Sequence, residues 1–184
     1  MPLNLELKIK IESIEYLIEK LKSINAKQDS ILLQKDIYYK IPAGLLKLRI
    51  ENGTKTLIYY NRDEISKNRW SDFNLLKIED DNAEEFLSKL FVVEEVVEKE
   101  RKLFWFNNTR IHLDEVKELG RFLELETLVI EGKADAEKRF DEIVRLLNLD
   151  LSKQIKKSYK NLIAEKTGKW SFQNVISKKL ILIF

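Results

Sequence analysis

The sequence contains no cysteine, which excludes disulfide bonds, thiolate catalysis and cysteine-ligated metals. It also lacks an apolar run near the ~20 residues that a membrane-spanning helix needs, since the run LILIF, residues 180–184, is much shorter. The chain enters a strand pattern at once, so we expect no signal or transit peptide. These absences together predict a cytoplasmic protein with no membrane partner.

Neither sign of charge dominates the chain. Its 33 basic and 31 acidic side chains give a net charge of +2, which argues against a basic surface for nucleic acid. Charged residues nevertheless make up 35% of the sequence. The positions of the charges therefore matter more than their sum.

Proline and glycine are scarce, with two and five residues, and they do not gather in a linker. A chain of 184 residues with 44% hydrophobic content has the size and the core of one domain. We expect this domain to span residues 1–166. The remaining extension, residues 167–184, would form an edge strand, an oligomer contact in a homodimer or a frayed tail.

Runs of alternating polarity predict strands. In LNLELKIKI, residues 3–11, the leucines and isoleucines point to one side of an extended chain and the polar residues to the other. Asn52-Gly53 and Asn107-Asn108 each lie between two such runs and predict tight hairpin turns. The predicted strands cover residues 3–11, 32–41, 45–50, 56–62, 69–78, 96–106, 109–116 and 121–131.

Other segments repeat apolar residues at helical spacing. Ser13 fits the N-cap of the first helix and Asn25 its end, and the segment 82–85 resembles a capping box. We predict an α+β fold in which one antiparallel sheet system, curled or closed, has helices packed outside. The predicted helices cover residues 14–24, 82–91, 134–147 and 152–165.

Charged residues recur at every second position on the polar sides of the strands. Lys47 and Arg49 alternate with leucines, and Glu124 and Glu126 share one side of FLELE. If the helices cover the apolar faces, the charged faces form either the solvated side of an open sheet or the lumen of a closed barrel. Repetition over five strands favours the lumen, where charges must pair or bind ions.

Such a lumen suits metal–triphosphate chemistry, because lysine and arginine bind phosphate. Carboxylates are ligands for Mg²⁺ or Mn²⁺, which join them to phosphate oxygens. His112 lies on the same face, where a proton or phosphate role and a structural role are both open. The cations on these faces are Lys8, Lys47, Arg49, Arg62, Arg69, Lys99, Arg101 and Arg110, and the carboxylates are Glu6, Asp114, Glu124 and Glu126.

At these residues the chain resembles the CYTH, or triphosphate tunnel metalloenzyme, family. The N-terminal hallmark of that family, E-x-E-x-K, matches Asn4-Leu-Glu6-Leu-Lys8. The resemblance continues through DIYYKIPAGLLKLRI, LIYYNRDE, RWSDF, TRIHLDEV, LGRFLELE and SYKNLI, over about residues 3–165. It implies an eight-stranded antiparallel β-barrel, the triphosphate tunnel, that binds ATP or a similar triphosphate-containing small molecule with Mg²⁺ or Mn²⁺.

The resemblance also implies roles for single residues. The four carboxylates match the metal ligands of that family and the eight cations match its phosphate-binding positions. Among them we expect Glu6, Lys8 and Arg49 to act in catalysis. Asn4 departs from the family pattern, which has a glutamate there. Its carbonyl oxygen can coordinate a metal but brings no negative charge.

Three functions follow from the resemblance. The first is a divalent-metal-dependent triphosphate phosphohydrolase acting on an organic or inorganic triphosphate. The second is a class IV-type adenylyl cyclase that makes cyclic AMP and pyrophosphate from ATP. The third is a non-catalytic triphosphate or polyphosphate binder, which the missing charge at Asn4 favours.

Overall fold

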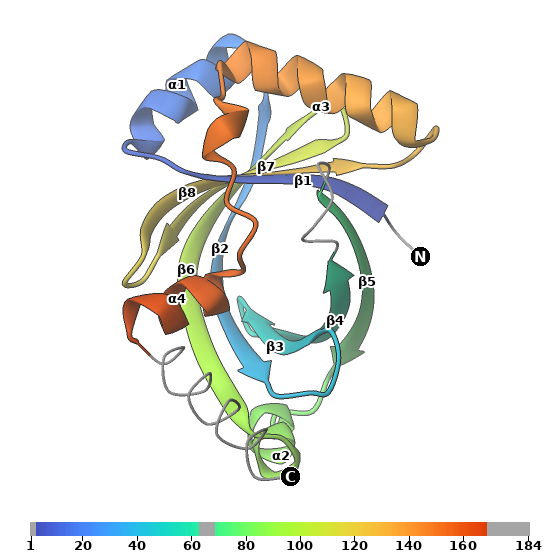
Figure 1. Cartoon of the computed structure of the whole chain (residues 1–184), viewed down its shortest axis with the longest axis vertical. Coiled ribbons are helices and arrows are strands. Elements are labelled where there is room, and N and C mark those ends of the chain that lie inside the picture. Colours follow the sequence, from blue (N-terminus) through green and yellow to red (C-terminus); the bar gives the residue numbers. More distant parts are fainter. Residues whose placement is uncertain (1–2, 63–68, 169–184) are drawn as a thin grey trace, which may run out of the picture.

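The computed structural model describes residues 3–62 and 69–168 (Figure 1). The helices are α1 (Ile14–Ser23), α2 (Ala83–Leu90), α3 (Lys133–Leu147) and α4 (Tyr159–Lys166), with a short 3₁₀ turn at Leu151–Lys153. The strands are β1 (Leu3–Lys10), β2 (Lys27–Tyr39), β3 (Leu45–Glu51), β4 (Thr54–Arg62), β5 (Arg69–Ile78), β6 (Val93–Phe106), β7 (Thr109–Val116) and β8 (Gly120–Leu128).

The eight strands form a closed barrel in the order β1-β5-β4-β3-β2-β6-β7-β8, and every neighbouring pair is antiparallel. β1 closes the ring, because Leu3 pairs with Asp72 of β5 while Lys8 pairs with Glu124 of β8. The predicted α+β fold with an eight-stranded antiparallel barrel is therefore confirmed.

The two predicted asparagine turns are present. Asn52 and Gly53 have φ values of 46° and 85° and join β3 to β4. Asn107 and Asn108 have φ values of 43° and 55° and join β6 to β7. Positive φ at both central residues matches the right-handed twist of the flanking strands, which is why asparagine and glycine occupy these positions.

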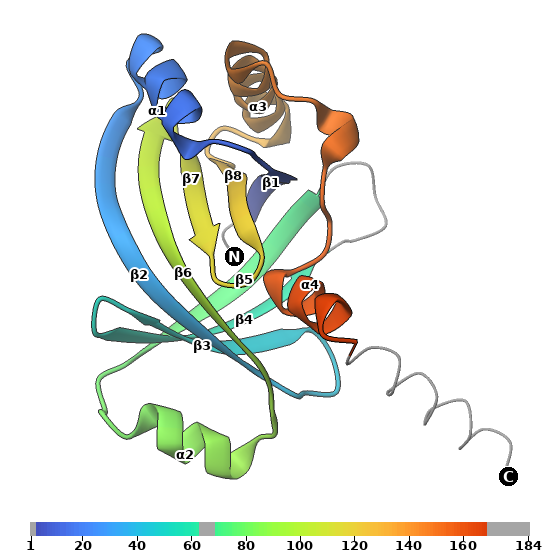
Figure 2. The same cartoon turned by 90° about the vertical axis from the view of Figure 1, so that its left-hand side faces the viewer.

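The apolar side of β1 faces outward to the helices. Leu5, Leu7 and Ile9 are buried in a cluster with apolar residues of α1, α3, β7 and β8. Figures 1 and 2 show α1 and α3 lying together over this part of the barrel. The outward orientation of the strand's apolar face is thus confirmed, and its charged face points into the barrel.

α2 covers another part of the wall, where Ala83 and Leu87 pack against Ile37 and Leu48 of β2 and β3. The segment 82–85 does open this helix, and Asn82 is the N-cap. Its side chain, however, makes no capping hydrogen bond. The predicted capping box is therefore wrong, whereas Ser13 caps α1 by accepting from the backbone N–H of Tyr16.

The fourth predicted helix, 152–165, is interrupted. The 3₁₀ turn ends at Lys153, and α4 begins only at Tyr159, after its N-cap Ser158. Between them, the backbone N–H of Ile155 donates to the carbonyl of Lys8 at 2.8 Å. This bond to β1 replaces the helical hydrogen bond that the periodicity had suggested.

α4 also occupies a place different from that of the other helices. Tyr159 and Ile163 are buried with Val97, Val116 and Phe122. These three strand residues lie two positions from Lys99, Asp114 and Glu124, on the lumen side of their strands. α4 therefore packs against the inner face of the barrel at one end of the tunnel.

None of the helices in the described ranges is long and apolar enough to cross a membrane. Most of the predicted extension, residues 169–184, lies outside the described residues, so the domain boundary at 166 and the homodimer contact stay predictions.

We expect the substitution Leu7→Ala to lower the free energy of unfolding by about 2–5 kcal/mol, because a fully buried leucine leaves a cavity. Leu7 is 1% exposed in the cluster under α1 and α3. Urea unfolding would measure the change. The matched control is Leu76→Ala, whose side chain is 62% exposed and should shift stability by less than about 0.5 kcal/mol. If the two variants lost the same free energy of unfolding, Leu7 would not lie on the buried face of β1 as assigned.

Candidate active site

The barrel encloses a cavity of about 320 Å³ lined by side chains from all eight strands. Charged side chains of both signs face it, as the alternation in the sequence predicted. Most of the predicted site residues meet here. Those that line the cavity are Asn4, Glu6, Lys8, Lys47, Arg49, Lys99, Arg101, Arg110, Glu124 and Glu126.

Three predicted residues are not in this set. Arg62 and Arg69 belong to β4 and β5, but their side chains lie outside the described part of the structure. Asp114 is fully buried behind the lining residues, against Arg101. Its role as a metal ligand stays a prediction, and Arg101 is its partner in the structure.

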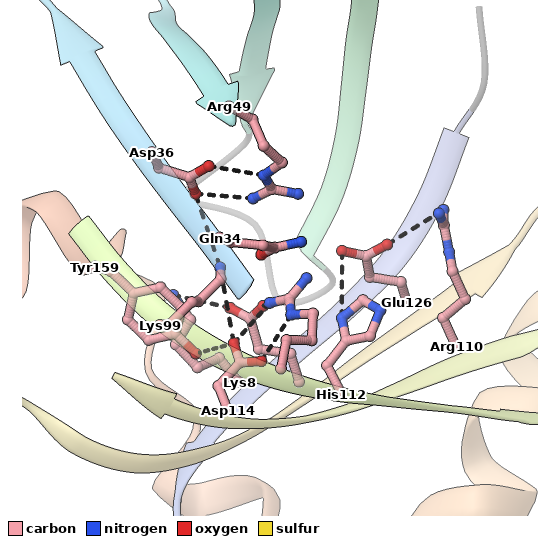
Figure 3. Close-up of polar contacts among 12 residues, drawn as sticks. Lys8, Gln34, Asp36, Arg49, Lys99, Arg110, His112, Asp114, Glu126 and Tyr159 are labelled. Atoms are coloured by element: carbon pink, nitrogen blue, oxygen red, sulfur yellow. Dashed lines mark hydrogen bonds and ion pairs between the residues drawn. The ribbon is translucent and has the colours of Figure 1, made fainter. Parts of the chain in front are cut away.

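One end of the charged region is organised by Asp36, which is completely buried (Figure 3). Its Oδ2 accepts from Lys47 Nζ at 2.8 Å, and its two oxygens accept from Arg49 Nε and Nη2 at 2.7 and 2.8 Å. Lys99 Nζ is 3.8 Å from the same carboxylate. Asp36 thus fixes three cations beside the cavity.

Arg101 joins the cations around Asp36 to the acidic wall, the part of the cavity lining that carries Glu124 and Glu126. Its Nε and Nη2 donate to the two oxygens of Asp114 at 2.7 and 2.6 Å, and Nη2 also donates to Glu124. Asp114 Oδ2 further accepts from the hydroxyl of Tyr159 at 2.9 Å. This fork geometry orients the guanidinium, because two parallel bonds allow one orientation only.

Lys8 lies between α4 and the acidic wall. Its Nζ is 3.2 Å from Glu124 Oε1, donates to the carbonyl of Lys157 at 3.1 Å and sits 3.9 Å from the centre of the Tyr159 ring. The interrupted segment before α4 therefore supplies direct contacts to a predicted catalytic residue.

Glu126 and His112 form the other side of the acidic wall (Figure 3). Arg110 Nη2 is 3.2 Å from Glu126 Oε2, and His112 Nδ1 is 3.8 Å from Glu126 Oε1. One ligand atom each from His112, Glu124 and Glu126 can lie within 4.8 Å of the others, so this group could hold a metal ion. The buried Oδ1 of Asn4, on the same cavity, has no hydrogen-bond partner among the described residues.

Neighbouring charges decide the protonation of these buried groups. Burial raises the pKa of Asp36, but Arg49 and Lys47 outweigh it and hold that pKa well below the usual 3.8. Burial and Arg49 lower the pKa of Lys47 well below 10.5, although Asp36 opposes them. Burial and Arg101 lower the pKa of His112 to about 4. The imidazole is therefore neutral at pH 7.

Neither Asp36 nor Tyr159 was among the site residues predicted from the sequence. A signal for Asp36 was present, because it shares one side of β2 with Gln34 and Tyr38 at a spacing of two. Tyr159 lies in SYKNLI, one of the segments that carry the resemblance, but nothing local indicates that its hydroxyl donates to Asp114, 45 residues away in the sequence.

We expect Asp36→Asn to destabilise the protein by about 3–5 kcal/mol, since it leaves buried cations without their carboxylate. Urea unfolding would measure the loss. Asp81→Asn is the matched control: it removes the same charge from a lysine partner, Lys55, but Asp81 is 96% exposed, and stability should not change measurably. A loss below about 1 kcal/mol for Asp36→Asn would contradict the buried pairing.

We also expect stability to fall steeply in acid. Burial raises the pKa values of Asp36 and Glu124, but neighbouring cations keep them well below the usual 3.8 and 4.5. The unfolded chain therefore binds protons first, so the stabilisation is complete above those usual values and is lost as pH falls through the lower folded ones. Unfolding free energies measured between about pH 7 and pH 2 would test this slope. Constant stability over that range would refute it.

Comparison of the sequence with known proteins places it in the same family as the resemblance did. The CYTH domain family matches residues 3–159. The Methanocaldococcus jannaschii protein named "Putative adenylate cyclase MJ0240" is 30% identical over 173 residues, which cover 87% of this chain and 98% of that protein.

Solved structures share the fold. PH1012 from Pyrococcus horikoshii is 25% identical, with a TM-score of 0.76 over 86% of this chain and 98% of its own. The Hippeastrum protein described as "Putative adenylyl cyclase HpAC1", with a dominant triphosphatase activity, is 12% identical, with a TM-score of 0.60 over 91% of this chain and 96% of its own. The family match over most of the sequence and the relative at 30% identity lead to one conclusion: this chain belongs to the CYTH domain family.

Proposed function

We propose that this protein is a divalent-metal-dependent triphosphate phosphohydrolase. The observation that carries the proposal is one cavity in which a group of fixed cations faces a wall of carboxylates. Cations alone would suit any polyanion. Carboxylates beside them would repel phosphate unless a metal ion lies between the two.

The phosphate chain would lie against Lys47, Arg49, Lys99 and Arg101. Buried acids already hold these side chains in place, as the contacts of Asp36 and Asp114 show. The cations would therefore lose little side-chain freedom when the substrate binds. The set that we assign to phosphate binding is completed by Lys8, Arg62, Arg69 and Arg110.

Glu6, Glu124 and Glu126 would hold the metal, Mg²⁺ or Mn²⁺, with the neutral oxygen of Asn4 as a further donor. The residues fit such an ion, because donor atoms of Glu124 and Glu126 converge, Glu6 lines the same cavity, and the buried Asn4 Oδ1 lacks a hydrogen bond from the described residues. When bound, a divalent ion neutralises phosphate charge and polarises the phosphorus–oxygen bonds.

In the proposed reaction, a water oxygen bonds to the terminal phosphorus while the bridging oxygen leaves with the diphosphate. Glu6 would orient that water from the cavity wall, and the proton that the water loses would pass to the Glu6 carboxylate and from there to solvent. Lys8 and Arg49 would stabilise the charge that develops on the phosphate oxygens. Fixed charges in a site shielded from water are effective in this task.

The second candidate is adenylyl cyclase activity, and the name of the relative at 30% identity favours it. The ribose 3′-hydroxyl of ATP would attack the α-phosphorus, and pyrophosphate would leave. The same cations and acids would serve this reaction. The triphosphatase activity attributed to HpAC1 supports the hydrolase as the first choice.

Product analysis distinguishes the candidates. The purified protein would be incubated with ATP, GTP, thiamine triphosphate or tripolyphosphate, each with Mg²⁺ or Mn²⁺. We expect release of inorganic phosphate that stops when the metal is chelated. Cyclic AMP with pyrophosphate would establish the cyclase instead. Metal-dependent binding without any product would leave a non-catalytic binder.

Lys99→Met should lower kcat/KM for the triphosphate by about 10²-fold or more, because it removes one fixed charge at the phosphate chain. The matched control is Lys102→Met on the same strand, β6. Lys102 pairs with Glu100 and is absent from the cavity lining, so this variant should keep the wild-type rate. Equal rates for the two variants would contradict the assigned site.

A further inference from the structure

His112 lies inside the barrel on β7 and is 4% exposed. Its Nδ1 atom is buried and makes no hydrogen bond within residues 3–62 and 69–168. Figure 3 shows the ring turned toward the carboxylate of Glu126, at a distance of 3.8 Å between Nδ1 and Oε1. The described residues thus leave this ring nitrogen without a hydrogen bond although it lies beside a carboxylate.

Strand register explains why the imidazole meets two acids. His112 pairs with Glu124 of β8, and Arg110 pairs with Glu126. Residues two apart lie on the same side of a strand, so His112 faces Glu124 directly and Glu126 diagonally. The three donor groups thus converge from neighbouring strands on one point of the cavity wall.

The two acids differ from the imidazole in their partners. Glu124 is paired with Lys8 and Arg101, and Glu126 with Arg110. These contacts keep both carboxylates charged and oriented toward the cavity. The imidazole nitrogen, a neutral donor at pH 7, remains available to a metal ion as an electron-pair donor.

We propose that Nδ1 of His112 is a metal ligand together with Glu124 and Glu126, and that this nitrogen makes the site prefer Mn²⁺ to Mg²⁺. Mg²⁺ takes oxygen ligands and water, whereas imidazole nitrogen favours ions of the first transition row. The proposal rests on the metal site of the proposed function and adds its ligand set and its metal preference.

The test uses Mn²⁺ itself as the probe. Because the chain has a single histidine, the full chain without added histidines can be labelled with [¹⁵N]histidine at this one position. Pulsed electron paramagnetic resonance of bound Mn²⁺ should show a ¹⁴N coupling in the unlabelled protein and a ¹⁵N coupling in the labelled one. This measurement needs no substitution, so it cannot fail through misfolding.

Calorimetry then measures the preference. His112→Gln should lower the ratio of Mn²⁺ to Mg²⁺ affinity by about 10-fold or more. The control is Thr109→Val on the same strand, because Thr109 is buried outside the cavity lining and its hydroxyl bonds that of Thr127. Its affinity ratio should equal that of the wild type.

Bound Mn²⁺ without nitrogen coupling, or no Mn²⁺ binding at all, would overturn the proposal. An unchanged affinity ratio in His112→Gln would overturn the preference. Triphosphate cleavage that persists beside such a result would leave the proposed function intact. If bound Mn²⁺ showed the nitrogen coupling but the protein cleaved no triphosphate, His112 would be supported as a metal ligand and the proposed phosphohydrolase function would be refuted.

Discussion

The tunnel depends on the pairing of buried carboxylates with buried cations. An unpaired charge in a closed barrel would cost too much free energy to persist. Arg101 shows how the structure meets this constraint, since it binds Asp114 from the adjacent strand and Glu124 from the next one. The same bonds that neutralise the lumen also aim its cations at the cavity. Stability and preorganisation therefore arise from one set of contacts.

α4 links the site to the rest of the fold. Three helices cover the outside of the barrel, whereas α4 packs on lumen residues at one end. Its first residue, Tyr159, donates to Asp114, and its ring lies beside Lys8. The chain just before it bonds to β1 through Ile155. The end of the tunnel and the charged site are consequently built from the same residues.

The cavity contains two regions of different character. Around Asp36 a carboxylate serves three cations, which leaves a net positive region suited to phosphate. The second region is the one that holds the converging acids Glu124 and Glu126, whose basic partners are Lys8, Arg101 and Arg110. The neutral donors Asn4 and His112 line the same cavity, and His112 belongs to the group that could hold a metal ion. A polyphosphate bound to the first region and a metal bound to the second would neutralise each other's charge.

Sequence reasoning reached much of the fold, because strand faces and tight turns depend on neighbouring residues. It failed at the fourth helix, where a hydrogen bond from Ile155 to Lys8 overrides the helical periodicity. It also missed Asp36, since a single acid in an alternating strand looks like an ordinary surface charge. Its partners Lys47 and Lys99 lie 11 and 63 positions further along the chain.

The sequence by itself determined which side chains share a face of each strand, because alternation has a period of two and is local. It thereby placed Glu6, Lys8, Glu124 and Glu126 on the inner side. Only the tertiary structure decided which charges meet, because that depends on the register between strands and on the closure of β1 against β5 and β8. The same register placed the Nδ1 atom of His112 between two acids, where it has no hydrogen bond from the part of the chain that the structure describes.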